Sequence, residues 1–342
     1  MKYSMVLLAA MLAALPGYGD SPSEVNKPAT DRNFWYELNL LYWQPWEKSA
    51  VVTNHYAPVL TTDNYTTKHL IHPNFKWDWG FRIGVGYYFV PPKWSLDLQW
   101  TNFSTNDSQT RSSNTDDSVN INQLGSFPIW DIPSTSFSGD YVSNSHLHWK
   151  LSLNLLDLNF TRIFQKDRWC FKPYVGLRSG WVRQKFDVEY SGGIFTLTFI
   201  SPGNDNNGIK TIEMRNEYWG LGPRVGFAPS VLLGKGISIY AESAISALMG
   251  CFHLDQHGEY LGTSEFHYHS NPFGLRWILD VAAGFMYCTA IFSDRYDLSL
   301  KLGYEFHEFY HQMELRRDRF NVAPHNSNLS LQGVTANVRM DF

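Results

Sequence analysis

The sequence predicts an all-β protein, a transmembrane antiparallel up-and-down β-barrel of about ten to fourteen strands with short periplasmic turns and long external loops. Three observations support this fold. Segments of alternating apolar and polar residues recur along the chain, short and long connections alternate between them, and the chain ends on a strand that finishes with an aromatic residue. A period of two is the pattern of a strand with one apolar and one polar face. In an outer-membrane barrel, lipid covers the apolar face.

The C-terminal strand carries the clearest version of this pattern. In residues 329–342, LSLQGVTANVRMDF, the side chains of Val334, Val338 and Phe342 fall on one face and those of Asn337 and Arg339 on the other. Such a strand needs a partner at its edge, and in a barrel it pairs with the first strand. The terminal phenylalanine also resembles the signal that the barrel-assembly machinery reads. A terminal edge strand of a soluble sandwich would alternate in the same way.

The N-terminus indicates export. Lys2 is followed by an apolar run over residues 5–15 and by small residues at Gly17 and Gly19. This pattern is typical of a secretory signal peptide, here residues 1–19, cleaved near Gly19. The run is shorter than the roughly twenty apolar residues of a membrane-spanning helix. We expect a periplasmic segment at 20–33, a single barrel domain at 34–342, and a location in the bacterial outer membrane.

Composition narrows the class of protein. Aromatic residues make up 16% of the chain, whereas the mean hydropathy is only −0.30. A barrel that alternates lipid-facing and lumen-facing residues produces this combination, while helical membrane proteins are more hydrophobic. The formal net charge of −4 argues against a nucleic-acid partner, because phosphate binding needs a cationic surface. The expected partners are the lipid bilayer, the assembly machinery and a possible second copy of the chain. No cofactor is expected.

About ten strands can be placed from the alternation. The clearest covers residues 77–89, where every odd position is apolar. The ten residues from Trp79 to Phe89 span ~33 Å, which a tilt of about 40° projects to ~25 Å of membrane depth. A phase change near Leu155 and Leu156 predicts a β-bulge. Long loops are expected at 44–75, 104–147, 191–211, 253–272 and 313–328. The strands are expected at 34–43, 77–89, 94–101, 149–164, 169–190, 218–227, 237–252, 275–287, 296–306 and 329–342.

The polar faces of these strands carry charges of both signs. The residues expected to line the pore are Glu37, Arg82, Asp97, Lys150, Asp157, Arg178, Arg224, Glu242, Arg276, Asp280, Lys301 and Glu305. Charged rings tune selectivity in channels, but the same charges can pair as salt bridges that fill a narrow lumen. The residues expected to face the membrane are Trp79, Val85, Phe89, Trp94, Trp100, Trp219, Trp277, Phe285 and Phe342.

Four stretches resemble the Legionella-type major outer membrane protein family. They are NLLDLNFTR (154–162), FKPYVGLR (171–178), WGLGPRVG (219–226) and the C-terminal strand. The resemblance covers the chain from about residue 34 to the end, and it implies a pore-forming outer-membrane β-barrel. It supplies no catalytic residues and does not extend to the mid-chain loops.

The function expected from these observations is an outer-membrane porin that passes small hydrophilic solutes and ions by diffusion. A surface-exposed structural protein or adhesin on a closed barrel is the main alternative, since the long loops could bind partners. An outer-membrane hydrolase built from Ser264, Glu265, His267 and Asp255 is a weaker one, because no motif fixes such a geometry. We expect no enzymatic activity.

Histidine and cysteine are two further residue types that can form sites. Histidines at 253, 257, 267, 269, 307 and 311 gather near strand ends, where a metal site is conceivable but solvated loop histidines are more common. No metal is expected. Cys170, Cys251 and Cys288 are widely spaced and odd in number, so isolated thiols or at most one disulfide are expected.

Overall fold

The structure is a computed structural model. It describes residues 33–47, 53–57, 66–71, 73–89, 94–112, 125–128, 141–196, 204–205, 208–291, 296–315 and 325–342. The expected signal peptide and nearly all of the expected periplasmic segment lie outside these residues. Within the described residues, no helix is long and apolar enough to cross a membrane.

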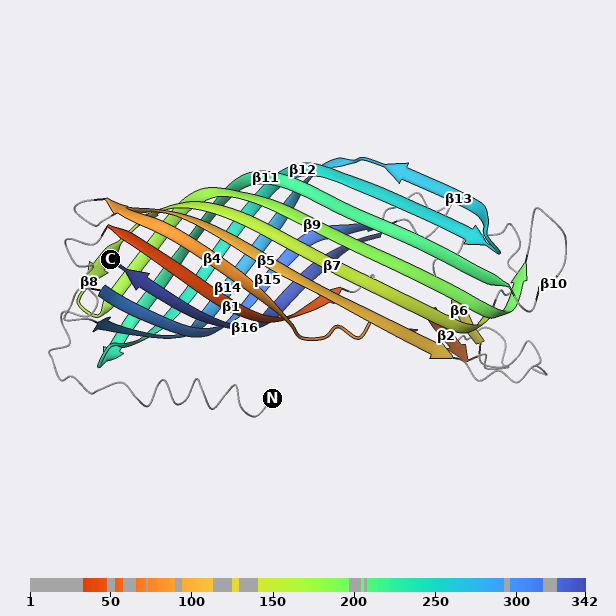
Figure 1. Ribbon diagram of the computed structural model, residues 1–342, viewed down its shortest axis with the longest axis horizontal. Helices are drawn as coiled ribbons and strands as arrows, with labels where there is room; N and C mark the ends of the chain where they lie inside the picture. The colour runs from red at the N-terminus through yellow and green to blue at the C-terminus, as the bar shows by residue number, and fades with distance from the viewer. Residues whose placement is uncertain are drawn as a thin grey trace.

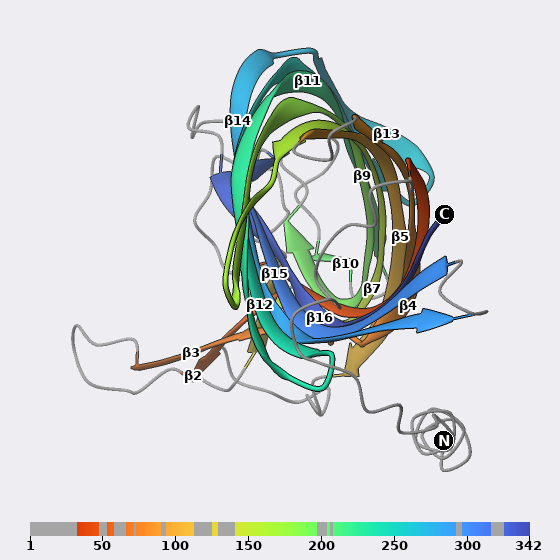
Figure 2. The same cartoon turned by 90° about the vertical axis from the view of Figure 1, so that its left-hand side faces the viewer.

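Ten strands form a closed antiparallel barrel, with additional short strands at its ends (Figures 1 and 2). The barrel strands are β1 (Phe34–Glu47), β4 (Asp78–Phe89), β5 (Trp94–Ser112), β7 (Tyr141–Arg162), β9 (Trp169–Thr196), β11 (Ile209–Gly234), β12 (Ile237–Tyr260), β14 (Phe273–Ile291), β15 (Tyr296–Leu315) and β16 (His325–Asp341). The short strands are β2 (Thr53–Ala57), β3 (Thr66–Ile71), β6 (Gly125–Pro128), β8 (Phe164–Lys166), β10 (Asn204–Asp205) and β13 (Thr263–Ser270).

The predicted closure of the barrel by its first and last strands is confirmed. β1 pairs with β16 from one end to the other, and β7 pairs with β9 to complete the ring. At the seam the Phe34 amide donates to the Phe342 carbonyl at 3.1 Å, and the Phe342 amide donates back at 2.9 Å. The Phe342 ring stacks on Tyr36, with ring centroids 5.1 Å apart.

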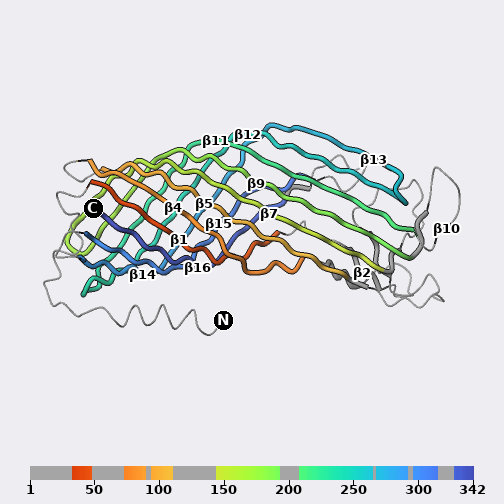
Figure 3. Tube along the Cα trace, in the orientation of Figure 1, coloured from red at the N-terminus to blue at the C-terminus, as the bar shows by residue number. Residues whose placement is uncertain are grey.

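The two ends of the barrel differ. The end that holds the C-terminus and the short connections is called the turn end here, and the opposite end the loop end (Figure 1). At the turn end Gly234, Lys235 and Gly236 all have positive φ, which lets β11 reverse into β12 within three residues. In outer-membrane barrels the short turns face the periplasm. β7, β9, β11 and β12 extend furthest toward the loop end (Figure 3).

A band of exposed apolar side chains surrounds the turn-end half of the barrel, as predicted. Trp79, Val85 and Phe285 are 66%, 44% and 61% exposed on the outer wall. Of the expected membrane-facing residues, Trp94 is the one that is half-buried, because its ring stacks on Phe160 at 4.8 Å. The others are exposed: Phe89, Trp100, Trp219, Trp277 and Phe342.

The band ends at a row of outward residues on neighbouring strands. Trp181 of β9, Trp219 of β11 and Cys251 of β12 are direct register partners. The Trp181–Trp219 pair lies where a girdle of aromatic residues marks the membrane interface in outer-membrane barrels. We call Trp181 and Trp219 the aromatic girdle.

Beyond the girdle the two faces exchange character. The inward side chains become apolar, as in Leu151, Leu153 and Val182, whereas the outward ones become polar, as in Arg183 and Glu217. The predicted bulge at Leu155 and Leu156 is wrong, because β7 keeps one register with β5 and β9 through both residues. The apolar face changes sides because the strand leaves the membrane, where water replaces lipid outside and protein fills the inside.

The expected long loops are therefore partly strand. β5 continues to Ser112 and β7 begins at Tyr141, so residues 104–112 and 141–147 of the expected loop at 104–147 are barrel wall. The expected histidine-rich loop at 253–272 is the hairpin of β12 and β13. These extensions were missed because their outward residues are polar, so the apolar alternation used to find strands is reversed or diluted there.

Candidate functional site: a charged belt across the barrel interior

The structure places the expected pore-lining residues on the inner wall, with one exception. Lys150 is exposed on the outer wall, between the fully buried Trp149 and Leu151, so its inward assignment is wrong. The error follows from the reversal of faces beyond the girdle. The other expected residues lie inside: Glu37, Arg82, Asp97, Asp157, Arg178, Arg224, Glu242, Arg276, Asp280, Lys301 and Glu305.

Seven of the inner residues make one connected network across the barrel. We call this network the belt, and it comprises Arg82, Asp157, Arg178, Arg224, Asp280, Glu305 and His307. Its side chains come from β4, β7, β9, β11, β14 and β15, which together span most of the circumference. The belt therefore joins opposite walls of the barrel rather than lining one wall.

One end of the belt is a two-pronged ion pair between distant strands. Arg82 of β4 donates from Nη1 and Nη2 to the two carboxylate oxygens of Glu305 on β15, at 3.2 and 3.0 Å. The Arg82 Nε also donates to Thr101 Oγ1 at 3.0 Å. Two-pronged arginine–carboxylate pairs fix geometry as well as charge. Because β1 and β16 lie between β4 and β15, this pair crosses the interior.

The other end of the belt centres on Asp280. Arg178 donates to both carboxylate oxygens of Asp157 at 2.6 and 2.8 Å, and its Nη1 lies 2.7 Å from Asp280 Oδ2. Arg224 reaches the same Asp280 oxygen at 3.2 Å and donates to Asn159 Oδ1 at 3.1 Å. Two guanidinium groups thus share one carboxylate in the middle of the barrel.

His307 joins the two ends. Its Nδ1 lies 2.8 Å from Asp280 Oδ1, and its Nε2 lies 3.2 Å from Glu305 Oε2. The imidazole ring thus contacts one carboxylate through each of its nitrogens. The ring also packs on Trp43, with centroids 4.7 Å apart. His307 was not among the predicted lumen residues, although its even spacing from Lys301 and Glu305 along β15 was a signal for an inward position.

The belt is buried. Asp157, Arg178 and Asp280 are 4%, 2% and 5% exposed. Separating one partner of a buried ion pair from the other typically costs about 3–5 kcal/mol, because the remaining charge stays out of water. The belt therefore connects the walls of the barrel through buried ion pairs. The inward charges pair with one another as salt bridges, and they do not line a water-filled pore at this level.

An apolar core fills the interior on the loop side of the belt. It includes Trp43, Phe103, Leu153 and Phe252, all nearly inaccessible to water. Phe75 packs edge-on against Trp149 with ring centroids 4.9 Å apart. Arg276, expected to line a pore, is held in this region by Glu314 and lies over the Phe252 ring at 4.5 Å. On the loop side of the belt, apolar side chains thus fill the barrel as they fill the core of a soluble protein.

On the turn side the interior is polar and more open. Glu37, Lys301 and Glu242 are half-buried, and the Glu242 side chain is 39% exposed. Tyr174 donates to Glu242 at 2.7 Å, and Asn159 donates to the buried Asp97 at 2.9 Å. The interior between the belt and the turn end is therefore lined by polar groups.

The other candidate sites are not assembled by the fold. Asp255 lies 2.8 Å from His267 on the outer wall, whereas Ser264 pairs with Glu259 near the tip of the same hairpin. Among the described residues, no group of three or more His, Cys, Asp or Glu is arranged to hold a metal ion. Cys170, Cys251 and Cys288 are free thiols.

Two solved structures of other proteins align with this chain at low identity. The OmpT outer-membrane protease of Escherichia coli aligns at 12% identity over 93% of this chain and 99% of that chain, with a TM-score of 0.42. A Pseudomonas aeruginosa FadL homologue aligns at 9% identity over 95% of each chain, with a TM-score of 0.27. No curated protein sequence matches.

The family comparison is decisive for the class of protein. The family model described as the Legionella pneumophila major outer membrane protein precursor matches residues 26–342, which is nearly the whole chain. The match includes every barrel strand and the resembling stretches noted in the sequence. This chain therefore belongs to the Legionella major outer membrane protein family and is a β-barrel of the bacterial outer membrane.

Proposed function

We propose that the protein is a surface-exposed structural barrel with a closed interior. The buried belt is the observation that carries this proposal. A solute that crossed the barrel would have to separate Arg82 from Glu305 or Arg178 from Asp280 and then pass an apolar core. Hydrophobic constrictions exclude water and ions even without a tight steric seal. The extended loop-end strands then serve to hold the external loops clear of the membrane.

Passive diffusion of small hydrophilic solutes is the second candidate function. The partly exposed charges on the turn side favour it, because a purely structural barrel does not need charges such as Glu242 and Lys301 in its interior. In that case the belt is a gate whose ion pairs rearrange. Hydrolysis has less support, since Ser264 and the Asp255–His267 pair are set apart along the hairpin.

Single-channel recording in planar lipid bilayers tests the choice between these functions. A closed barrel leaves the bilayer sealed at every protein concentration. Stepwise current from the unaltered protein would contradict the structural proposal and support the pore. Identical recordings without added protein exclude leakage of the bilayer itself.

A paired variant tests whether the belt is what closes the barrel. Arg82→Ala/Glu305→Ala removes both charges of that pair and leaves His307 in contact with Asp280. This variant is expected to produce current where the unaltered protein gives none. The matched control removes an outer-wall ion pair, in Arg183→Ala/Glu217→Ala, whose charges lie 3.6 Å apart. Current from the control as well would show that the effect comes from general loosening.

A further inference from the structure

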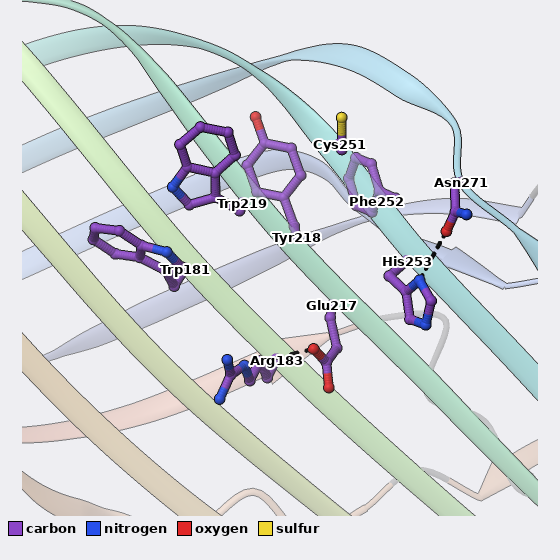
Figure 4. Close-up of a pocket in the computed structure, with 9 residues that line it drawn as sticks. All are labelled: Trp181, Arg183, Glu217, Tyr218, Trp219, Cys251, Phe252, His253 and Asn271. Carbon is purple, nitrogen blue, oxygen red and sulfur yellow. Dashed lines mark hydrogen bonds and ion pairs between the residues drawn. The ribbon is translucent and has the colours of Figure 1, made fainter.

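A groove of about 320 Å³ opens on the outer wall at the edge of the apolar band (Figure 4). Its floor is aromatic, with Trp181 and Trp219 of the girdle. Its loop-side rim is polar, with Arg183, Glu217 and the hydrogen-bonded pair His253 and Asn271. The groove is thus apolar on its membrane side and polar on its loop side.

A row of cations lies immediately beyond this groove. Lys150, Lys185 and Arg215 are direct register partners on β7, β9 and β11, and all three face outward. Like charges opposite one another on neighbouring strands repel and destabilise the sheet. Three in succession are therefore unfavourable unless an anion lies among them.

Acidic residues on the loop-end side of this row balance part of its positive charge. Asp187 lies 2.8 Å from Lys185, and Glu213 lies 3.6 Å from Arg215, one rung further toward the loop end. On the membrane side the next rung holds Arg183 and Glu217, 3.6 Å apart and both well exposed. The row and Arg183 therefore contribute four cations. Glu217 is the acid on the single rung between the row and the girdle, and Asp255 of β12, which contacts His267, ends the row beside Arg215.

The depth of these residues matches that of lipid headgroups. Arg183 and Lys185 lie two and four residues beyond Trp181, or ~5 and ~10 Å above the girdle for a strand tilted by about 40°. Lysine and arginine side chains are long enough to bend back toward a charged group at the interface. Aromatic girdles themselves lie at headgroup level.

We propose that this outer face binds the phosphate-bearing headgroup of a membrane lipid in the leaflet at the loop end. The phosphate lies among Arg183, Lys185 and Arg215, with Lys150 at the edge. The acyl chains run down the groove over Trp219 and Trp181 and continue along the apolar band. The proposal does not depend on whether the barrel conducts.

Lipid titration followed by native mass spectrometry tests this proposal on the full-length protein in non-ionic detergent. The probes are short-chain phosphatidylglycerol, diacylglycerol without a phosphate, and inorganic phosphate. We expect saturable binding of phosphatidylglycerol and much weaker binding of diacylglycerol. In Lys185→Gln/Arg215→Gln the apparent affinity for phosphatidylglycerol is expected to fall at least about tenfold, since each interfacial cation contributes substantially to anionic lipid binding.

The matched control is Lys166→Gln/Arg168→Gln, which removes two exposed cations at the turn end and is expected to bind as the unaltered protein does. The single variant Lys150→Gln should give a smaller loss in the same direction. Equal affinity in the unaltered protein and the first variant would overturn the proposal, as would equal binding of diacylglycerol. Displacement of the lipid by inorganic phosphate at similar concentration would identify a site for free phosphate and also overturn it.

Discussion

Trp149 and Lys150 are adjacent in β7 and lie in opposite environments. The Trp149 ring is fully buried against Phe75 inside the barrel, and Lys150 is exposed on the outer wall. Toward the turn end of the same strand the order is reversed, with Leu158 outside and Asp157 inside. Within one strand and without a break in register, the apolar side chains therefore face outward near the turn end and inward near the loop end.

This reversal predicts that substitutions at two neighbouring residues differ strongly in their effect on stability. Leu151→Lys places a charge in the fully buried apolar core, which is expected to lower the thermal unfolding midpoint strongly, because an unpaired buried charge costs several kcal/mol. Lys150→Leu changes only an exposed position and is expected to unfold close to the unaltered protein. Circular dichroism during heating in detergent measures both midpoints. Similar midpoints for the two variants would contradict the reversal.

The lipid-facing assignment of β4 predicts an assembly defect. Val85 is 44% exposed in the apolar band, so Val85→Arg places a charge against lipid at a cost of about 2–4 kcal/mol near the midplane. The matched control is Gln99→Arg on the inner wall, where Gln99 lies opposite Gly84 and close to Glu37, which can pair with the new charge. Folded yield in the outer-membrane fraction is the measurement. Equal yields would show that Val85 does not face lipid.

The central position of Asp280 predicts a large effect of neutralising it. Asp280→Asn leaves Arg178, Arg224 and His307 with one carboxylate fewer in a buried network, and it is expected to destabilise the barrel by about 3–5 kcal/mol. Asp187→Asn, which removes an outer-wall partner of Lys185, is expected to cost at most about 1 kcal/mol. Urea unfolding of both variants in the same lipid separates the two cases. A similarly small effect at both sites would contradict a structural role for the belt.

Close approach of two strands at Gly222 gives a further prediction. A Cβ atom there would lie 1.8 Å from the Ala247 carbonyl oxygen, which is backbone and cannot move aside alone. Gly222→Ala should therefore displace β12 and lower the folded fraction. At Gly274 the nearest atom is the flexible end of Arg276 at 3.0 Å, so Gly274→Ala should be tolerated. Electrophoretic mobility before and after heating reports the folded fraction, and equal tolerance would argue against this contact.

The sequence by itself determined where the strands cross the membrane and which face of each strand lies outward there. Alternation of residues such as Trp79, Val85 and Phe89 depends only on the two-residue period of a strand and on lipid outside it, so local pattern was sufficient. The closing role of the C-terminal strand followed in the same way, because a strand without a partner leaves unpaired backbone groups in the membrane.

Only the tertiary structure decided what lies inside the barrel. Alternation shows that Trp149 and Lys150 face opposite ways, but which face is interior depends on where β7 leaves the membrane. The partners of Arg82, Asp280 and His307 come from strands far apart in the chain, and their pairing is set by barrel closure and strand register. Those long-range relations turn a set of inward charges into a transverse belt.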